Sequence, residues 1–183
     1  MNYLTIRPNG DNSVGWTTFG SGSYHYDRVN EVTEDDSNGV SCVIASAYGE
    51  IYSDYFNIQN HSAESGTISG VTIYAIYQTT YGTDYGTPTE INLYCNGYNT
   101  NIFDGRYSGS KKDTGIWAMS VNPATGVAWT WTNIDDIVCG IQGEPGLRDK
   151  GKAGVDYDII YCYQFFAIVA YGAAVPTLFM MHG

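Results

Sequence analysis

The sequence is poor in charged residues and contains no long apolar run. Asp, Glu, Lys and Arg make up 15% of its 183 residues, which equals the share of Phe, Trp and Tyr. With 17 Tyr and 22 Gly, the surface must be covered largely by Tyr, Ser, Thr, Asn and Gly, a composition typical of β-rich proteins. Because no run of about 18 apolar residues occurs, we expect no membrane span.

Basic residues are scarcer than acidic ones. The 8 Lys and Arg against 19 Asp and Glu give a net charge of −11. This charge repels a phosphate backbone, so direct binding of nucleic acid is not expected. It suits a protein that must stay soluble until it assembles. A single domain of this length buries roughly 70% of the surface of its unfolded chain, so a core can form without metal or disulfide staples.

The cysteines do not have the spacing of a metal site. They are Cys42, Cys95, Cys139 and Cys162. No CxxC pair is present, and no His lies at ligand spacing. Each cysteine lies in an apolar run, which favours buried free thiols, with one or two disulfides as the alternative.

The two ends of the chain differ in character. Met1 leads directly into Tyr3–Ile6 without the basic and apolar regions of a secretion signal, so we expect synthesis for the cytoplasm. We expect residues 1–172 to form one domain and residues 173–183 to form an apolar C-terminal arm, which packs on its own or on a neighbouring subunit. The candidate subunit-interface residues of the arm are Val175, Leu178, Phe179, Met180 and Met181.

Turn signals and short apolar runs alternate along the chain. Turns are predicted at the Gly-, Asn-, Asp- and Ser-rich segments 9–12, 20–23, 35–39, 96–97 and 108–110. Strands are predicted at Leu4–Pro8, Val40–Ala45, Tyr52–Ile58, Thr67–Thr79, Glu90–Cys95, Gly115–Val121 and Tyr157–Tyr171. This spacing predicts an all-β, jelly-roll-like antiparallel β-sandwich.

Two of these runs show different patterns of burial. Between Val71 and Tyr77 the odd positions can face one side, while Thr72 and Tyr74 face the other. Residues 159–171 are apolar on both sides, which places this strand in the middle of a sheet, or between a core and a neighbouring subunit.

One short helix is also predicted. Thr132–Asp135 has the spacing of a capping box, and Asp135 and Asp136 would favour the positive end of the helix. Such a helix would close one mouth of the sandwich with Trp129 or Trp131.

The sequence offers little for catalysis. Its three histidines, His25, His61 and His182, are not at HxH or HExxH spacing, so we expect no enzyme and no catalytic residue. A glycosidase is the weakest alternative, because the sequence alone does not show that any two carboxylates lie at the separation that a glycosidase requires. No cofactor is expected except, weakly, structural calcium. Its candidate ligands are Asp11, Asp35, Asp36 and Asp54.

Aromatic residues among polar neighbours suggest contact surfaces. A tyrosine ring is apolar with one polar tip, which suits interfaces, sugar faces and ordinary sheet surfaces alike. The candidates for stacking on glycans are Trp16, Tyr81, Tyr85 and Tyr98.

Several segments resemble a family of small β-sandwich domains found in structural proteins of tailed bacteriophages and archaeal viruses. The matching segments are Leu4–Asp11 with Gly15–Thr17, Val29–Asp36, Gly66–Tyr74, Asn122–Trp131 with Ile134–Asp135 and Gly140–Ile141, and Cys162–Tyr171. The block from Asn122, of the form NPxTGxAWTxxxID…GI, is the most specific. The resemblance implies a jelly-roll-like head, tail or decoration component without catalytic residues. The apolar extension 173–183 departs from the pattern and favours a subunit that polymerises.

These observations lead to one main functional hypothesis. We expect a virion structural protein that is assembled in the host cytoplasm through Tyr-rich surfaces and the arm. Its partners are copies of itself, other virion proteins and, as an option, surface glycans. The alternatives are a carbohydrate-binding module for surface attachment and an extracellular filament subunit of cellular origin.

Overall fold

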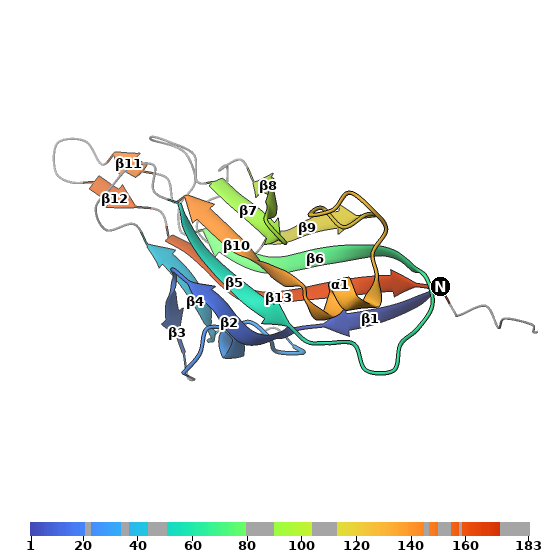
Figure 1. Cartoon of the computed structure of the whole chain (residues 1–183). Helices are drawn as coiled ribbons and strands as arrows, with labels where there is room; N and C mark the ends of the chain where they lie inside the picture. The colour runs from blue at the N-terminus through green and yellow to red at the C-terminus, as the bar shows by residue number, and fades with distance from the viewer. Residues whose placement is uncertain are drawn as a thin grey trace, which may run out of the picture.

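The chain forms a sandwich of two antiparallel sheets (Figure 1). The computed structural model describes residues 1–20, 23–33, 37–43, 51–79, 90–103, 113–144, 147–149, 155–157 and 159–172. Sheet A contains β1 (Asn2–Ile6), β3 (Thr17–Phe19), β4 (Gly39–Val43), β6 (Ile68–Thr79), β9 (Asp113–Met119) and β13 (Ile159–Tyr171). Sheet B contains β2 (Pro8–Val14), β5 (Tyr52–Ile58), β7 (Glu90–Cys95), β8 (Tyr98–Phe103) and β10 (Val138–Glu144). A separate ribbon pairs β11 (Leu147–Asp149) with β12 (Val155–Tyr157), and the helices are the 3₁₀ turn η1 (Tyr26–Arg28) and α1 (Trp131–Asp135).

The strand order is that of a jelly roll. Sheet A runs β4-β13-β6-β9 and sheet B runs β5-β10-β7-β8, so consecutive strands of these two four-stranded layers alternate between the sheets except at the β7–β8 hairpin. The first and last of these eight strands, β4 and β13, lie side by side. This is the arrangement of two Greek keys in an eight-stranded jelly roll. The predicted fold class is therefore confirmed. β3 extends sheet A beside β4, β2 extends sheet B beside β5, and β1 pairs with β13.

The core lies between the sheets and explains the sequence pattern of the long strands. On β6, Val71, Ile73, Ala75 and Tyr77 are all buried, as their alternation predicts. The strand β13 lies between β6 on one side and β4 and β1 on the other. This position confirms the prediction that residues 159–171 form a strand in the middle of a sheet. Phe165 meets Phe56 of sheet B with the ring centroids 5.6 Å apart.

The N-terminal segment departs from the prediction. Residues 4–8 were expected as one strand, but the chain leaves sheet A after Ile6 and enters sheet B at Pro8. Residues 9–12 were expected as a turn and instead belong to β2. This strand lies at the edge of its sheet and contains two register shifts. Edge strands with bulges accept the Gly, Asn and Asp residues that interior strands exclude. The predicted turn at Asn96-Gly97 is correct, because both residues have positive φ in the hairpin from β7 to β8.

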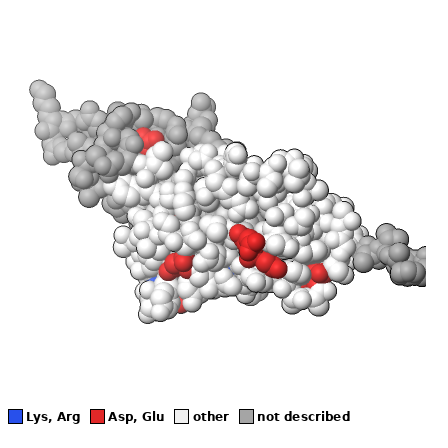
Figure 2. All heavy atoms as spheres, in the orientation of Figure 1, with Lys and Arg blue, Asp and Glu red and all other residues white. Residues whose placement is uncertain are grey.

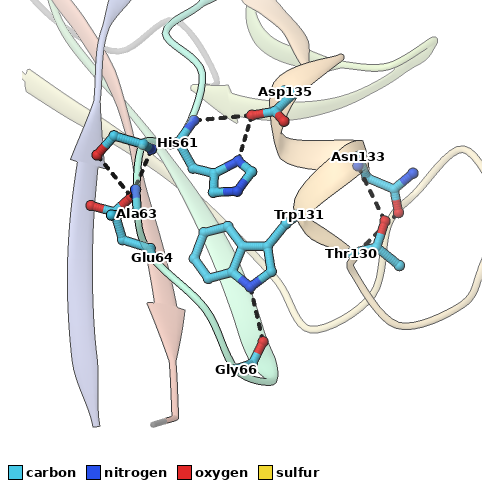
Figure 3. Close-up of polar contacts among 9 residues, drawn as sticks. His61, Ala63, Glu64, Gly66, Thr130, Trp131, Asn133 and Asp135 are labelled. Carbon is cyan, nitrogen blue, oxygen red and sulfur yellow. Dashed lines mark hydrogen bonds and ion pairs between the residues drawn. The ribbon is translucent and has the colours of Figure 1, made fainter. Parts of the chain in front are cut away.

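The short helix is where the sequence places it, but its capping differs. Thr130, and not Thr132, is the N-cap, and its side chain accepts from the N–H of Asn133 at 3.2 Å (Figure 3). The Asn133 side chain accepts from the N–H of Thr130 at 3.1 Å, which completes a capping box. The carboxylate of Asp135 therefore lies at the C-terminal end of α1, opposite to the prediction. With five residues, α1 is far shorter than a membrane crossing requires, and no other α-helix occurs in the described ranges.

Candidate interaction surfaces

The outer face of sheet A carries large apolar side chains. Phe166 pairs with Tyr74, and Tyr74 pairs with Ile116 on β9, so the three side chains form a row across the sheet. Ile116 is 55% exposed. We call this surface the aromatic face. Its residues are Phe19, Tyr74, Ile76, Ile116, Tyr161, Tyr163, Phe166 and Ile168.

The centre of the aromatic face is a stacked pair of rings. The ring centroids of Tyr74 and Phe166 are 5.0 Å apart, and the ring planes differ by 7°. The guanidinium of Arg7 lies 5.2 Å from the centroid of Phe166, within cation–π range. It also donates to the carbonyl of Glu31 at 2.6 Å. Partial burial lowers the pKa of Arg7, against the opposing effect of the Glu31 charge. The guanidinium of Arg7, next to this face, is thus bound to groups of its own chain.

A second aromatic cluster lies at the β3 end of the same face. The rings of Tyr161 and Tyr163 stack at 6.1 Å, and Phe19 meets both edge-on at 5.4 and 5.7 Å. The hydroxyl of Tyr163 donates to Gln78 at 2.8 Å. Tyr163 is consequently buried although it lies outside the core. Rings that cover one another in this way make a firm, largely apolar surface.

A shallow hollow lies beside the central row. It has a volume of about 310 Å³ and is formed where β6, β9 and β13 carry small residues. The lining residues are Ser69, Gly70, Val71, Thr72, Ala118, Met119, Ser120 and Ala170. The outer face of sheet A thus combines a ridge of large side chains with a hollow of small ones.

The outer face of sheet B has a different chemistry. Gly140 of β10 pairs with Tyr55 on one side and Tyr94 on the other, and the two rings stack across it with centroids 4.0 Å apart. The side-chain amide of Gln142 donates to the hydroxyl of Tyr55, and it accepts from Asn99 at 2.8 Å. We call this surface the polar face. Its residues are Ser53, Tyr55, Asn57, Asn92, Tyr94, Asn99 and Gln142.

The polar face consists of uncharged side chains. Stacked rings flanked by amides and hydroxyls can hold a neutral polar ligand, because the rings offer apolar surface and the amides offer both donors and acceptors. Figure 2 shows one side of the molecule, where Lys and Arg are almost absent and Asp and Glu gather in small patches.

Two of the predicted calcium ligands hold backbone groups instead. Asp54 is fully buried, and its Oδ1 accepts from the N–H groups of Gly15 and Trp16. Asp11 accepts from the N–H groups of His25 and Tyr26 at 3.1 and 2.7 Å. The expectation of a loop calcium ligand is wrong for Asp54, which lies in β5 with its oxygens occupied.

The remaining calcium candidates, Asp35 and Asp36, lie outside the described residues. Within the described ranges, no group of three or more His, Cys, Asp or Glu side chains is arranged to hold a metal ion.

A histidine and a carboxylate meet beside α1 (Figure 3). Nδ1 of His61 lies 2.7 Å from Oδ1 of Asp135, and the His61 N–H donates to the same oxygen at 3.0 Å. These hydrogen bonds lower the pKa of Asp135. The indole of Trp131 lies 4.9 Å from the imidazole and donates to the carbonyl of Gly66 at 2.9 Å. The cluster fastens the loop between β5 and β6 to α1.

The cluster beside α1 lacks the geometry of a nucleophile and its base. The hydroxyl of Ser62 lies 3.3 Å from Glu64, to which it donates. The N–H groups of Ser62 and Ala63 point to the same carboxylate and lower the pKa of Glu64. The neighbouring serine is therefore engaged with Glu64 and not with His61.

The predicted glycan-stacking residues that the structure describes differ in exposure. Trp16 belongs to the core and is 6% exposed, so its prediction as an open stacking platform is wrong. The backbone N–H of Trp16 donates to Asp54, which holds the residue in the core. Tyr98 is 52% exposed at the hairpin between β7 and β8. Tyr81 and Tyr85 lie outside the described residues, as do the arm residues Val175, Leu178, Phe179, Met180 and Met181.

Sequence reasoning named Tyr55 and Tyr94 as tyrosines among polar neighbours, but it missed that they stack on each other and that Tyr74 stacks on Phe166. The alternation in β6 already places Tyr74 outward. No sequence pattern predicts that Tyr55 and Tyr94 stack across Gly140, because this contact depends on the register of three strands that are far apart in the sequence.

Comparison with known proteins gives distant similarities to solved structures. No family model and no curated protein matches the sequence. Among solved structures, the chain is similar to CBM35 of Abf62 from Cellvibrio japonicus, with 10% identity, a TM-score of 0.38, and coverage of 95% of this chain and 100% of that one. It is also similar to the structure of infectious bursal disease virus, Gx strain, with 10% identity, a TM-score of 0.34, and coverage of 95% and 57%. At these scores the function must be argued from the side chains.

Proposed function

We propose that the chain is a non-enzymatic structural subunit of a virus particle that associates with copies of itself through the aromatic face. The observation that carries the proposal is the row of Phe166, Tyr74 and Ile116 on the side of sheet A that faces away from the core. Burying apolar surface contributes about 25 cal/mol per Å². A contiguous apolar patch on a sheet is a typical protein contact site.

The shape of the aromatic face supports contact between identical copies. The row of large side chains lies next to the hollow, whose lining includes Gly70, Ala118 and Ala170. In a two-fold contact each copy supplies the same surface, so the ridge of one copy can enter the hollow of the other. The chain carries a net charge of −11, but the side chains named on the aromatic face are uncharged and Arg7 is engaged with its own chain, so repulsion at the contact itself is small.

The particle component and the place of assembly belong to the same proposal. The resemblance to virion β-sandwich domains favours a head, decoration or tail subunit, assembled in the host cytoplasm with other virion proteins. The apolar residues 173–183 would add a second contact between subunits. A specific interface should bury more than about 1,000 Å² in total, which a sheet face and an arm can supply together.

The test places one acidic side chain on the aromatic face. Ile116→Glu removes a 55% exposed apolar residue, and Val14→Glu is the matched control because Val14 is 53% exposed on β2 of sheet B. Sedimentation across a wide range of concentrations should show assembly of the wild type and of Val14→Glu, and monomers for Ile116→Glu. A wild type that stays monomeric at the highest concentration would refute the proposal.

A second function is favoured by the polar face. The stacked pair of Tyr55 and Tyr94, with the amides of Gln142 and Asn99 alongside, supports binding of neutral glycans for attachment to a surface. Such a ligand needs apolar ring contact and several hydrogen bonds but no charge.

The polar face is tested by binding to an array of neutral oligosaccharides. Tyr94→Ala and Gln142→Ala should each reduce the signal at least tenfold. Tyr3→Ala, which removes a 67% exposed ring from β1 of sheet A, should leave it unchanged. Absence of any bound glycan for the wild type would remove this second function.

A further inference from the structure

Two of the four cysteines face each other inside sheet B. Cys95 on β7 and Cys139 on β10 are directly paired in the strand ladder. Both side chains are fully buried, and their Sγ atoms are 3.1 Å apart. They are 44 residues apart in the sequence, so only the fold brings them together.

The position of the pair in the ladder suits a covalent bond. The N–H of Asn96 donates to the carbonyl of Val138 at 2.9 Å, so the adjacent pair of Cys95 and Cys139 is a non-hydrogen-bonded pair. In such pairs the Cα atoms are about 4.5 Å apart and the side chains approach closely. Disulfides span Cα separations of about 4.4–6.8 Å, so the backbone need not move.

We infer that Cys95 and Cys139 form a disulfide that joins β7 to β10 when the chain folds in an oxidising thiol buffer or compartment. With oxidised glutathione as oxidant, one thiolate attacks the glutathione disulfide and releases one glutathione thiol. The second cysteine then displaces the other glutathione, and the Sγ–Sγ bond forms. Two electrons pass to the oxidised glutathione, which leaves as two thiols, and the two cysteine protons are taken up by these thiols.

The other two cysteines are not placed for the same reaction. Cys42 pairs with Ile160, and Cys162 pairs with Val40, so these two sulfurs belong to diagonal positions of the ladder. Diagonal neighbours are about 7–8 Å apart. Each thiol is instead directed at a carbonyl, Cys42 at Gly143 and Cys162 at Gln164. They serve as the internal control.

Burial decides when the bond can form. Burial and the neighbouring Cys95 raise the pKa of Cys139 far above its ordinary value, and only a thiolate attacks a disulfide. Oxidation therefore belongs to folding or to a transient opening of β7, while the closed domain protects the thiols. In a reducing cytoplasm the pair would stay reduced, and the link would form under oxidising conditions. This inference does not depend on the proposed assembly function.

The experiment folds the full chain from denaturant in a buffer of reduced and oxidised glutathione. Remaining thiols are alkylated under denaturing conditions, and the linked peptides are identified by mass spectrometry. We expect Cys42 and Cys162 to be alkylated and Cys95 to be linked to Cys139. Four alkylated cysteines, or a link that includes Cys42 or Cys162, would overturn the inference.

Two variants sharpen this test. Cys95→Ala and Cys42→Ala each remove one buried sulfur, so their packing defects are comparable. Cys42→Ala should keep the link and Cys95→Ala should lose it. In urea, the oxidised wild type and oxidised Cys42→Ala should unfold at higher concentrations than their reduced forms, because the link closes a long loop. Equal midpoints for oxidised and reduced wild type would show that the bond does not fit the folded ladder, and would overturn the inference as well.

Discussion

Replacing Asp54 tests how the segment between β2 and β4 is held to the sandwich. The Asp54 side chain is fully buried on β5, and its Oδ1 accepts from the N–H groups of Gly15 at 2.8 Å and Trp16 at 2.9 Å. Its Oδ2 lies 2.6 Å from Nδ1 of His25. One carboxylate thus holds three groups that precede it by 29 to 39 residues. The substitution Asp54→Ala removes all three contacts.

The expected loss follows from the groups left without a partner. A buried N–H that loses its acceptor costs about 1–3 kcal/mol. Trp16 supplies one such buried N–H, and the N–H of Gly15 is part-buried. With the lost contact to His25, Asp54→Ala should lower the free energy of unfolding by about 2–4 kcal/mol. Asp54→Asn keeps one oxygen for the two N–H groups and places an amide donor opposite Nδ1 of His25, which accepts it when the ring proton is on Nε2. Its loss should therefore be smaller, about 1–2 kcal/mol.

Urea denaturation followed by tryptophan fluorescence measures both variants at the same pH. The free energy of unfolding should decrease in the order wild type, Asp54→Asn, Asp54→Ala, with the same dependence on urea concentration. A loss below about 1 kcal/mol for Asp54→Ala would refute the reasoning, because buried N–H groups cannot lose their acceptor at so small a cost. Equal losses for the two variants would refute the role assigned to the shared oxygen.

Two further predictions concern the polar face and the cluster beside α1. Gly140→Ala should destabilise the fold by about 1–3 kcal/mol in urea, because its Cβ would collide with the carbonyl oxygen of Asp54 and the ring of Tyr55; a neutral result would contradict the close packing of these rings. The pKa of Asp135 is lowered by hydrogen bonds from His61, so this contact stabilises the fold above the ordinary pKa of about 3.9 and is lost as the pH falls through the lowered value. The stability advantage of wild type over Asp135→Asn should therefore shrink as the pH falls below about 4, and an advantage that does not decrease between about pH 5 and about pH 2 would contradict the lowered pKa.

The fold was predictable where one rule decided the structure. In β6 the apolar residues alternate because one side faces the core. In β13 they do not, because the residues that face away from the core, such as Phe166 and Ile168, are also apolar and belong to the aromatic face. The rule fails for β2, where Gly, Asn and Asp occupy a bulged edge strand. It also fails for β10, because Gly140 and Gly143 interrupt the apolar pattern although close packing against Asp54 and Ile160 requires them.

The candidate surfaces were less predictable, because they depend on contacts between distant segments. Trp16 was predicted as an exposed stacking platform, but its backbone N–H is bound by Asp54 and the residue belongs to the core. Tyr55 and Tyr94 were visible as tyrosines among polar neighbours. Their stacking required knowledge that both pair with Gly140. The approach of Cys95 to Cys139 has the same origin.

The two outer faces are separated by the core, so their proposed roles should be separable by mutation. Ile116→Glu alters the aromatic face and should abolish self-association while leaving the affinity of one chain for a glycan unchanged. Tyr94→Ala alters the polar face and should do the reverse. Loss of both properties in Ile116→Glu would mean that glycan retention depends on several weak sites held together by the assembly. Loss of both in Tyr94→Ala, with the fold intact, would instead place the polar face in the contact between subunits and refute the assignment of assembly to sheet A.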